Sequence, residues 1–130
     1  MHHNCTHEYS VNAFRLYSRC GCPETEVLSQ LELNDPAFLD LKAVDRTFSS
    51  LRGENDGADV MNCVREVYLR DPEELYHKGT VQLRVRRAGD LFSMSESTVY
   101  RNLGKACRLF ARYRGLHDPD DEDWLTALFK

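Results

Sequence analysis

The sequence predicts an all-α protein, a small multi-helix domain whose C-terminal half contains a helix-turn-helix. Apolar residues recur at steps of three and four positions in successive segments, as on one face of an amphipathic helix. Helix boundary signals separate these segments, among them Gly21-Cys22-Pro23, Asp35-Pro36 and Asp71-Pro72. With 130 residues, the chain is long enough to form one domain with its own core.

Each expected helix follows from its apolar spacing and its boundaries. Asp35 is expected to cap the third helix and Pro36 to occupy its first position. Cys63 and Cys107 fall at near-apolar helical positions and are expected to be small buried hydrophobes. The helices expected in order cover residues 9–17, 24–33, 36–52, 58–69, one or two turns within 73–78, 81–92, 96–113 and the segment after Pro119.

The segment from Thr80 to Gly115 predicts two helices joined by a tight turn. Gly89 leaves room for a close crossing of the two helices. Ser95 stands at an N-cap position with Glu96 in the first turn, where a carboxylate suits the positive helix end. The buried stripes are expected to comprise Val81, Val85, Ala88 and Phe92 in the first helix, and Val99, Leu103, Ala106 and Phe110 in the second.

The stretch from Ala88 to Arg101, AGDLFSMSESTVYR, resembles the DNA-binding module of sigma-factor region 4. The shared pattern is a small pair and an acid before a hydrophobic residue, then a turn, an apolar residue and S-x-x-T-V. Ser93 replaces the usual turn glycine, a mild departure because serine tolerates turns. The resemblance implies that the second helix enters the major groove of double-stranded DNA.

The layout of residues 56–116 also resembles that of lambdoid-phage late-gene antitermination proteins of the Q type. This likeness implies a phage or prophage regulator that binds DNA near a promoter and acts on a paused bacterial RNA polymerase. A simpler transcription activator with the same module is an alternative. Another is a protein-interaction inhibitor of host machinery that binds no DNA.

The charge distribution favours a nucleic-acid partner although the net charge is −4. Between Lys78 and Leu116 there are nine basic and two acidic residues, so this segment carries +7 and the remainder −11. Phosphate attraction depends on such a local field more than on the whole-chain charge. The alternative is that these cations only solvate two exposed helix faces.

The expected DNA contacts divide by role. Arg101 is the candidate for bidentate contact with guanine, Tyr100 for a thymine methyl or a phosphate, and Glu96 for cytosine. Ser95 and Thr98 are candidates for phosphate contacts at the helix start. The full set is Arg84, Arg86, Arg87, Ser95, Glu96, Ser97, Thr98, Tyr100, Arg101, Lys105 and Arg108.

The N-terminal segment contains Cys5-x-His7 and Cys20-x-Cys22, which could supply four soft ligands to one zinc ion. The one-residue spacing is less favourable than the usual two to four residues, and the alternative is that the cysteines are free thiols. No other cofactor is expected.

Three regions are expected: an acidic N-terminal helical region at 1–57 for a partner contact or zinc, a DNA-binding region at 58–116, and an acidic C-terminal helix at 117–130. No enzyme motif occurs, neither a phosphate loop, G-x-S-x-G nor H-E-x-x-H, so enzymatic activity is not expected. Without an apolar run of about 18 residues or an export signal, we expect no membrane partner and a cytoplasmic location in a bacterial host.

Overall fold

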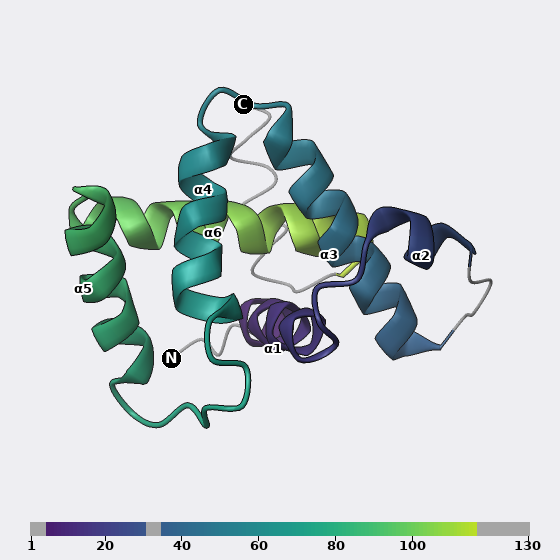
Figure 1. The fold of residues 1–130 in the computed structure, drawn as a ribbon, viewed down its shortest axis with the longest axis horizontal. Coiled ribbons are helices and arrows are strands. Elements are labelled where there is room, and N and C mark those ends of the chain that lie inside the picture. Colours follow the sequence, from purple (N-terminus) through teal and green to yellow (C-terminus); the bar gives the residue numbers. More distant parts are fainter. Residues whose placement is uncertain (1–4, 31–34, 117–130) are drawn as a thin grey trace.

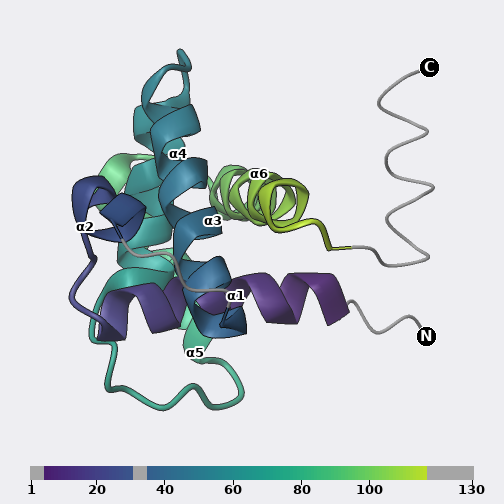
Figure 2. The same cartoon turned by 90° about the vertical axis from the view of Figure 1, so that its right-hand side faces the viewer.

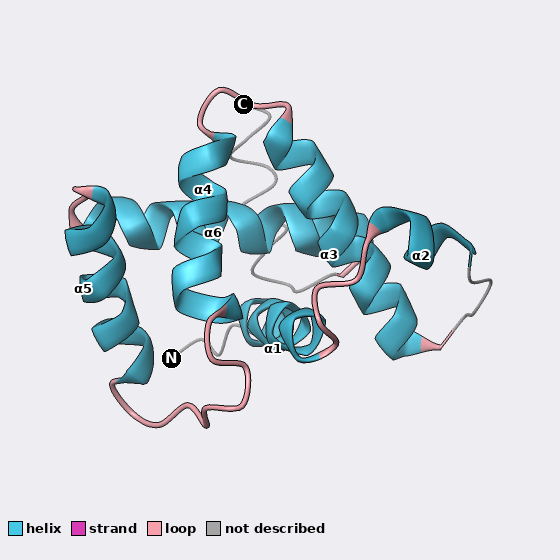
Figure 3. Ribbon diagram, in the orientation of Figure 1, coloured by secondary structure: helices cyan, strands magenta, loops and turns pink. Residues whose placement is uncertain are grey.

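The computed structural model describes residues 5–30 and 35–116, and the elements in these ranges are all helices (Figures 1 and 3). The prediction of a small all-α domain is confirmed for this part of the chain. Residues 31–33 of the expected second helix and the expected helix at 117–130 lie outside the described ranges. The elements are α1 (Cys5–Arg19), α2 (Thr25–Gln30), α3 (Pro36–Arg52), α4 (Gly57–Val64), η1 (Arg65–Leu69), α5 (Thr80–Phe92) and α6 (Glu96–Arg114).

The long helix α6 lies at the centre of the arrangement. It runs behind α3 and α4 in Figure 1, with α5 beside its first turns, and Figure 2 shows it end-on above α1. The ring centroid of Phe14 on α1 lies 5.8 Å from the ring centroid of Phe48, 5.9 Å from that of Tyr68 and 5.7 Å from that of Phe110. These aromatic contacts join α1, α3, η1 and α6 into one core.

The buried core crosses the expected region boundary at residue 57. Leu51 before the boundary and Val60 after it are both fully buried in the same cluster. The chain turns there at Gly57, where a Cβ atom would lie 1.5 Å from the Leu51 carbonyl oxygen. Only glycine allows this close approach, and the acidic and basic regions therefore fold as one packed unit.

The boundary signals of the third expected helix are confirmed. The Asp35 carboxylate accepts a hydrogen bond of 2.8 Å from the Ala37 amide, and Pro36 follows as the first helical residue. The fourth expected helix is also present, but its last part is the π-helical turn η1, in which the Arg70 amide donates to the Arg65 carbonyl at 2.9 Å. This wider turn leaves the carbonyls of Val67 and Leu69 to be satisfied by side chains.

The expected turns of helix within 73–78 do not form, and residues 70–79 are irregular. The Tyr76 hydroxyl donates to the Val67 carbonyl, and the Arg15 guanidinium donates to the Glu74 carbonyl. These contacts bind the segment to η1 and α1. Thr80 is the first residue of α5, and its hydroxyl accepts a hydrogen bond from the His77 amide at 3.0 Å.

Arg84 of α5 is buried, with 3% of its surface exposed. Its guanidinium donates to the carbonyls of Val67 at 3.1 Å and Arg70 at 2.6 Å, which caps the end of η1. It also forms an ion pair of 2.8 Å with Glu74 and lies over the Tyr76 ring at 4.9 Å. A buried cation is tolerated only when it is paired and hydrogen-bonded in this way. Arg84 therefore attaches α5 to the rest of the domain.

Replacing Arg84 with methionine should lower the free energy of unfolding by about 2–4 kcal/mol, because the Arg70 carbonyl loses its side-chain donor, the Val67 carbonyl keeps only the Tyr76 hydroxyl, and Glu74 loses its partner. Arg86→Met is the matched control at an exposed position two residues away, and it should change stability by less than about 0.5 kcal/mol. Urea unfolding followed by circular dichroism measures both variants. Equal midpoints for the two would contradict the capping role.

Because of the ion pair between Arg84 and Glu74, the free energy of unfolding should decrease at acidic pH. The hydrogen bond from Arg84, together with its charge, lowers the pKa of the Glu74 carboxyl below its usual value. The stabilisation is therefore complete above the unfolded-state pKa and is lost as the pH falls through the lower folded-state pKa.

Glu74→Gln should remove this contribution, so that the variant loses less stability than the wild type between about pH 5 and pH 3. Thermal unfolding across this pH range measures the difference. Glu73→Gln changes the same charge at an exposed neighbouring position and should keep the wild-type dependence. A Glu74→Gln curve parallel to that of the wild type would refute the assignment.

Candidate nucleic-acid interface

The start of α6 is capped as the sequence predicts. Ser95 has extended backbone angles, and its hydroxyl oxygen accepts a hydrogen bond of 3.1 Å from the Thr98 amide. The hydroxyls of Ser95 and Thr98 also lie 2.9 Å apart, within hydrogen-bond distance. This geometry satisfies one amide at the helix start and holds both hydroxyls at the positive end of the helix.

The turn between α5 and α6 comprises residues 93–95. Ser93 adopts the left-handed conformation with φ 55°. The Met94 amide donates to the Gly89 carbonyl at 2.9 Å, and a Cβ on Gly89 would lie 2.7 Å from the Met94 carbonyl oxygen. Gly89 was expected to make room for a close crossing of the two helices, but the close approach is to the turn, since the nearest atom of α6, Val99 Cγ2, would lie 4.0 Å from that Cβ.

The first two turns of α6 present one exposed face to solvent. Glu96, Ser97, Tyr100 and Arg101 are all exposed, and the Tyr100 side chain retains 46% of its accessible surface. Val99 and Leu103 on the opposite face are buried against the rest of the domain. The exposed face thus combines polar, aromatic and cationic side chains directly after a capped helix start.

Basic side chains extend this surface on both helices. Arg86 and Arg87 on α5 are exposed, as is Arg108 on α6. The Arg108 guanidinium lies over Gly104, where a Cβ atom would come within 3.1 Å of Nη1. The missing side chain at Gly104 lets the Arg108 guanidinium lie along α6.

Two of the expected DNA contacts are paired with other side chains of the protein, Arg84 in the interior and Lys105 at the surface. Arg84 is buried in the contacts with η1 and Glu74 and does not reach the surface. Lys105 forms ion pairs of 2.5 Å with Glu54 and 2.9 Å with Asp56 on the loop between α3 and α4. These hydrogen bonds, first that of Glu54 and then that of Asp56, raise the pKa of Lys105. We therefore assign Arg84 and Lys105 to fold stability and omit them from the interface.

Arg112 is a candidate that the sequence-based set of contacts left out. It is exposed on α6, four residues after Arg108 and eleven after Arg101. This spacing places the three arginines along one side of the helix, and the spacing alone could have identified the third. Arg114, two residues further on, is instead paired with Asp40 at 2.7 Å.

The four expected zinc ligands divide between the two ends of α1. Cys5 and His7 lie at its start, whereas Cys20 and Cys22 follow its end. A helix of 15 residues is about 22 Å long, whereas zinc ligands lie about 2.0–2.3 Å from the ion. One zinc ion cannot therefore be bound by all four residues of a single chain. Within the described residues, no group of three or more His, Cys, Asp or Glu is placed to hold a metal ion.

The two helical cysteines are buried as predicted, with Cys63 0% and Cys107 5% exposed. Burial raises the pKa of both thiols, that of Cys107 to about 12. They are therefore protonated at neutral pH and pack as small apolar side chains.

Comparison of the chain with models of protein families, with curated proteins and with solved structures finds no match. Among the helices of the described ranges, none has both the length and the apolar character needed to cross a membrane.

Gly89→Ala should lower the free energy of unfolding by about 1–3 kcal/mol, because the new Cβ forces α5 away from the turn. Gly53→Ala is the control, since its Cβ would meet only the Ser50 carbonyl oxygen at 3.7 Å, and it should change stability little. Urea unfolding measures both. A Gly89→Ala variant as stable as Gly53→Ala would show that the backbone approach is not required.

Proposed function

We propose that this protein is a transcription regulator that binds double-stranded DNA in a sequence-specific manner through the first turns of α6. The observation that supports this most directly is the exposure of Tyr100 and Arg101 just after the Ser95 cap. A capped helix start that presents such side chains has the chemistry needed to read base edges in a major groove. The exposed Arg86 and Arg87 on the preceding helix provide phosphate attraction.

The roles within this surface follow from their chemistry. Arg101 forms bidentate hydrogen bonds with a guanine, while Tyr100 and Ser97 contact neighbouring bases or phosphates. Glu96 accepts a hydrogen bond from a cytosine. Ser95 and Thr98, near the amides of the helix start, contact a phosphate. Arg86, Arg87, Arg108 and Arg112 contact the backbone and fix the position of the protein on the duplex.

The specific activity that we propose is that of a Q-type antitermination factor acting on bacterial RNA polymerase. Its support is the sequence resemblance over residues 56–116, which includes α4, α5 and α6. In this role the protein binds DNA near a promoter and joins a paused polymerase. The acidic N-terminal half provides the contact surface for the polymerase.

Arg101→Ala should weaken binding to the preferred duplex by about 1–3 kcal/mol and relax the preference at one base position. Arg87→Ala should weaken binding to all duplexes by the same factor and reduce the slope of log K against log salt concentration by about 0.9. The preferred sequence is first selected from a random duplex pool. Fluorescence anisotropy then measures each variant at several salt concentrations.

Arg19→Ala, an exposed cation at the end of α1, is the matched control and should bind DNA as the wild type does. Selection that enriches no sequence would argue against specific recognition. Arg101→Ala and Arg87→Ala variants with the same sequence profile would contradict the assigned roles.

Transcription with purified bacterial RNA polymerase tests the antitermination activity. A template with the selected site upstream of a terminator should give more read-through product when the protein is added, and a template with a scrambled site should not. Increased initiation without read-through would instead identify an activator. DNA binding without any effect on transcription would exclude both.

A further inference from the structure

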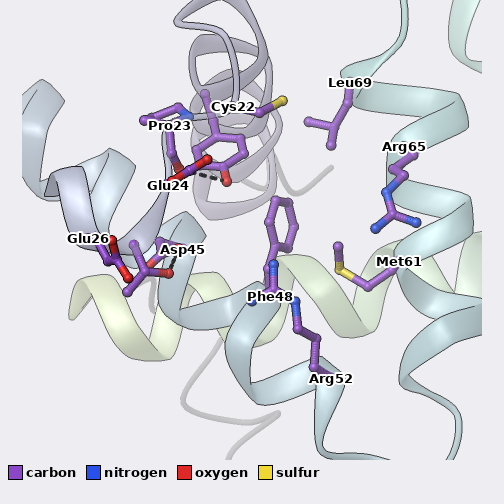
Figure 4. Close-up of a pocket in the computed structure, with 12 residues that line it drawn as sticks. Cys22, Pro23, Glu24, Glu26, Asp45, Phe48, Arg52, Met61, Arg65 and Leu69 are labelled. Atoms are coloured by element: carbon purple, nitrogen blue, oxygen red, sulfur yellow. Dashed lines mark hydrogen bonds between the residues drawn. The ribbon is translucent and has the colours of Figure 1, made fainter.

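A pocket of about 440 Å³ lies apart from the α5–α6 pair. It is formed by the end of α1 and the following loop, by α2, by α3 and by the π-helical turn η1 with the adjacent end of α4 (Figure 4). Its volume lies within the range of small-molecule sites. The lining combines an apolar centre with charged groups of both signs, and these groups are separated in space.

One wall of the pocket is cationic. Arg52 at the end of α3 and Arg65 at the start of η1 direct their side chains toward the space beside Phe48 and Met61 (Figure 4). The hydrogen bond of Arg65 within the described residues goes to the Asn62 amide oxygen at 3.4 Å. No carboxylate in the described ranges lies within ion-pair distance of Arg52 or Arg65, in contrast to Arg84 and Arg114. Both guanidinium groups can therefore bind and donate hydrogen bonds to an anionic ligand.

The Cys22 thiol also lines the pocket, but it provides no negative charge to pair with Arg65. Burial raises the pKa of the Cys22 thiol, and the charge of Arg65 only partly opposes the shift. Cys22 is therefore a neutral thiol at pH 7, so Arg65 has no anionic partner on the loop after α1.

The opposite wall is acidic. Asp45 on α3 is buried, with 7% exposed, and accepts a hydrogen bond from the Thr25 hydroxyl at 2.8 Å. Glu24 and Glu26 also line the pocket, and Figure 4 shows Glu26 next to Asp45, with all three acids on the side away from Arg65. Carboxylates grouped in this way favour an ammonium group.

The space between the two walls is apolar. Phe48, Met61 and Leu69 line it, together with the Tyr17 ring, whose hydroxyl donates to the Pro23 carbonyl at 3.2 Å. An apolar centre with opposite charges at its two ends selects a ligand with the complementary arrangement.

We propose that this pocket binds a short zwitterionic peptide, with its carboxylate on Arg52 and Arg65, its ammonium toward Asp45 and Glu24, and an apolar side chain against Phe48 and Met61. A dipeptide fits the two separated walls better than a single amino acid, because its ammonium and carboxylate groups are further apart. In a single amino acid both groups are attached to the same carbon. The carboxylate forms paired hydrogen bonds with planar guanidinium groups, for which arginine is suited.

Isothermal titration calorimetry of the full chain with glycyl-L-phenylalanine tests the proposal. We expect a dissociation constant of about 0.1–1 mM and about tenfold weaker binding of the N-acetyl and C-terminal amide derivatives. Free phenylalanine and acetate should also bind at least about tenfold more weakly. Acetate that binds as tightly as the dipeptide, or derivatives that bind equally well, would overturn the dipolar assignment.

Arg52→Ala and Arg65→Ala should each weaken dipeptide binding about tenfold, and both positions are exposed, so the fold should be retained. Arg112→Ala on the far helix is the matched control and should bind the dipeptide as the wild type does. The site would be refuted if no heat of binding were measured at about 10 mM dipeptide, or if all three variants lost dipeptide affinity equally. DNA binding by Arg52→Ala should remain unchanged, so failure here is distinguishable from failure of the proposed DNA function.

Discussion

The buried guanidinium of Arg84 determines where the α5–α6 pair sits on the domain. Its donors reach the Val67 carbonyl, which the π-helical turn leaves open, and the carbonyl of Arg70 just after the turn, and its charge is balanced by Glu74. A cation in this position would be costly without all of these partners. The irregular segment 70–79 follows from the same requirement, because it carries Glu74 and Tyr76 to the guanidinium.

Acidic residues of the N-terminal half form ion pairs with some of the basic residues of the C-terminal half. Asp40 pairs with Arg114, and Glu54 and Asp56 pair with Lys105, so α6 is neutralised along the part that packs on α3 and α4. Arg101 at its other end is exposed. The fold thus leaves exposed positive charge mainly on α5 and one side of α6, which gives a chain of net charge −4 a local basic surface.

The pocket and the α5–α6 pair use different side chains but share the π-helical turn η1. Leu69 and Arg65 line the pocket, while the carbonyl of Val67 in the same turn accepts from Arg84. A π-helical turn orients neighbouring residues differently from an α-helical one, and here it lets one short element contribute to both surfaces. The two sites are therefore connected through a single segment.

Local sequence was enough to predict the helices that have strong boundary signals. Asp35-Pro36 and Ser95 start their helices through their own side chains, and the stripe from Val99 to Phe110 is buried because helical periodicity places those residues on one face. The exposure of Tyr100 and Arg101 follows from the same periodicity. The three-dimensional fold was needed to show which arginines and lysines are paired within the protein, because the partners of Arg84 and Lys105 come from other segments of the chain. It also showed that Cys5 lies far from Cys22, because most of the residues between them form the helix α1.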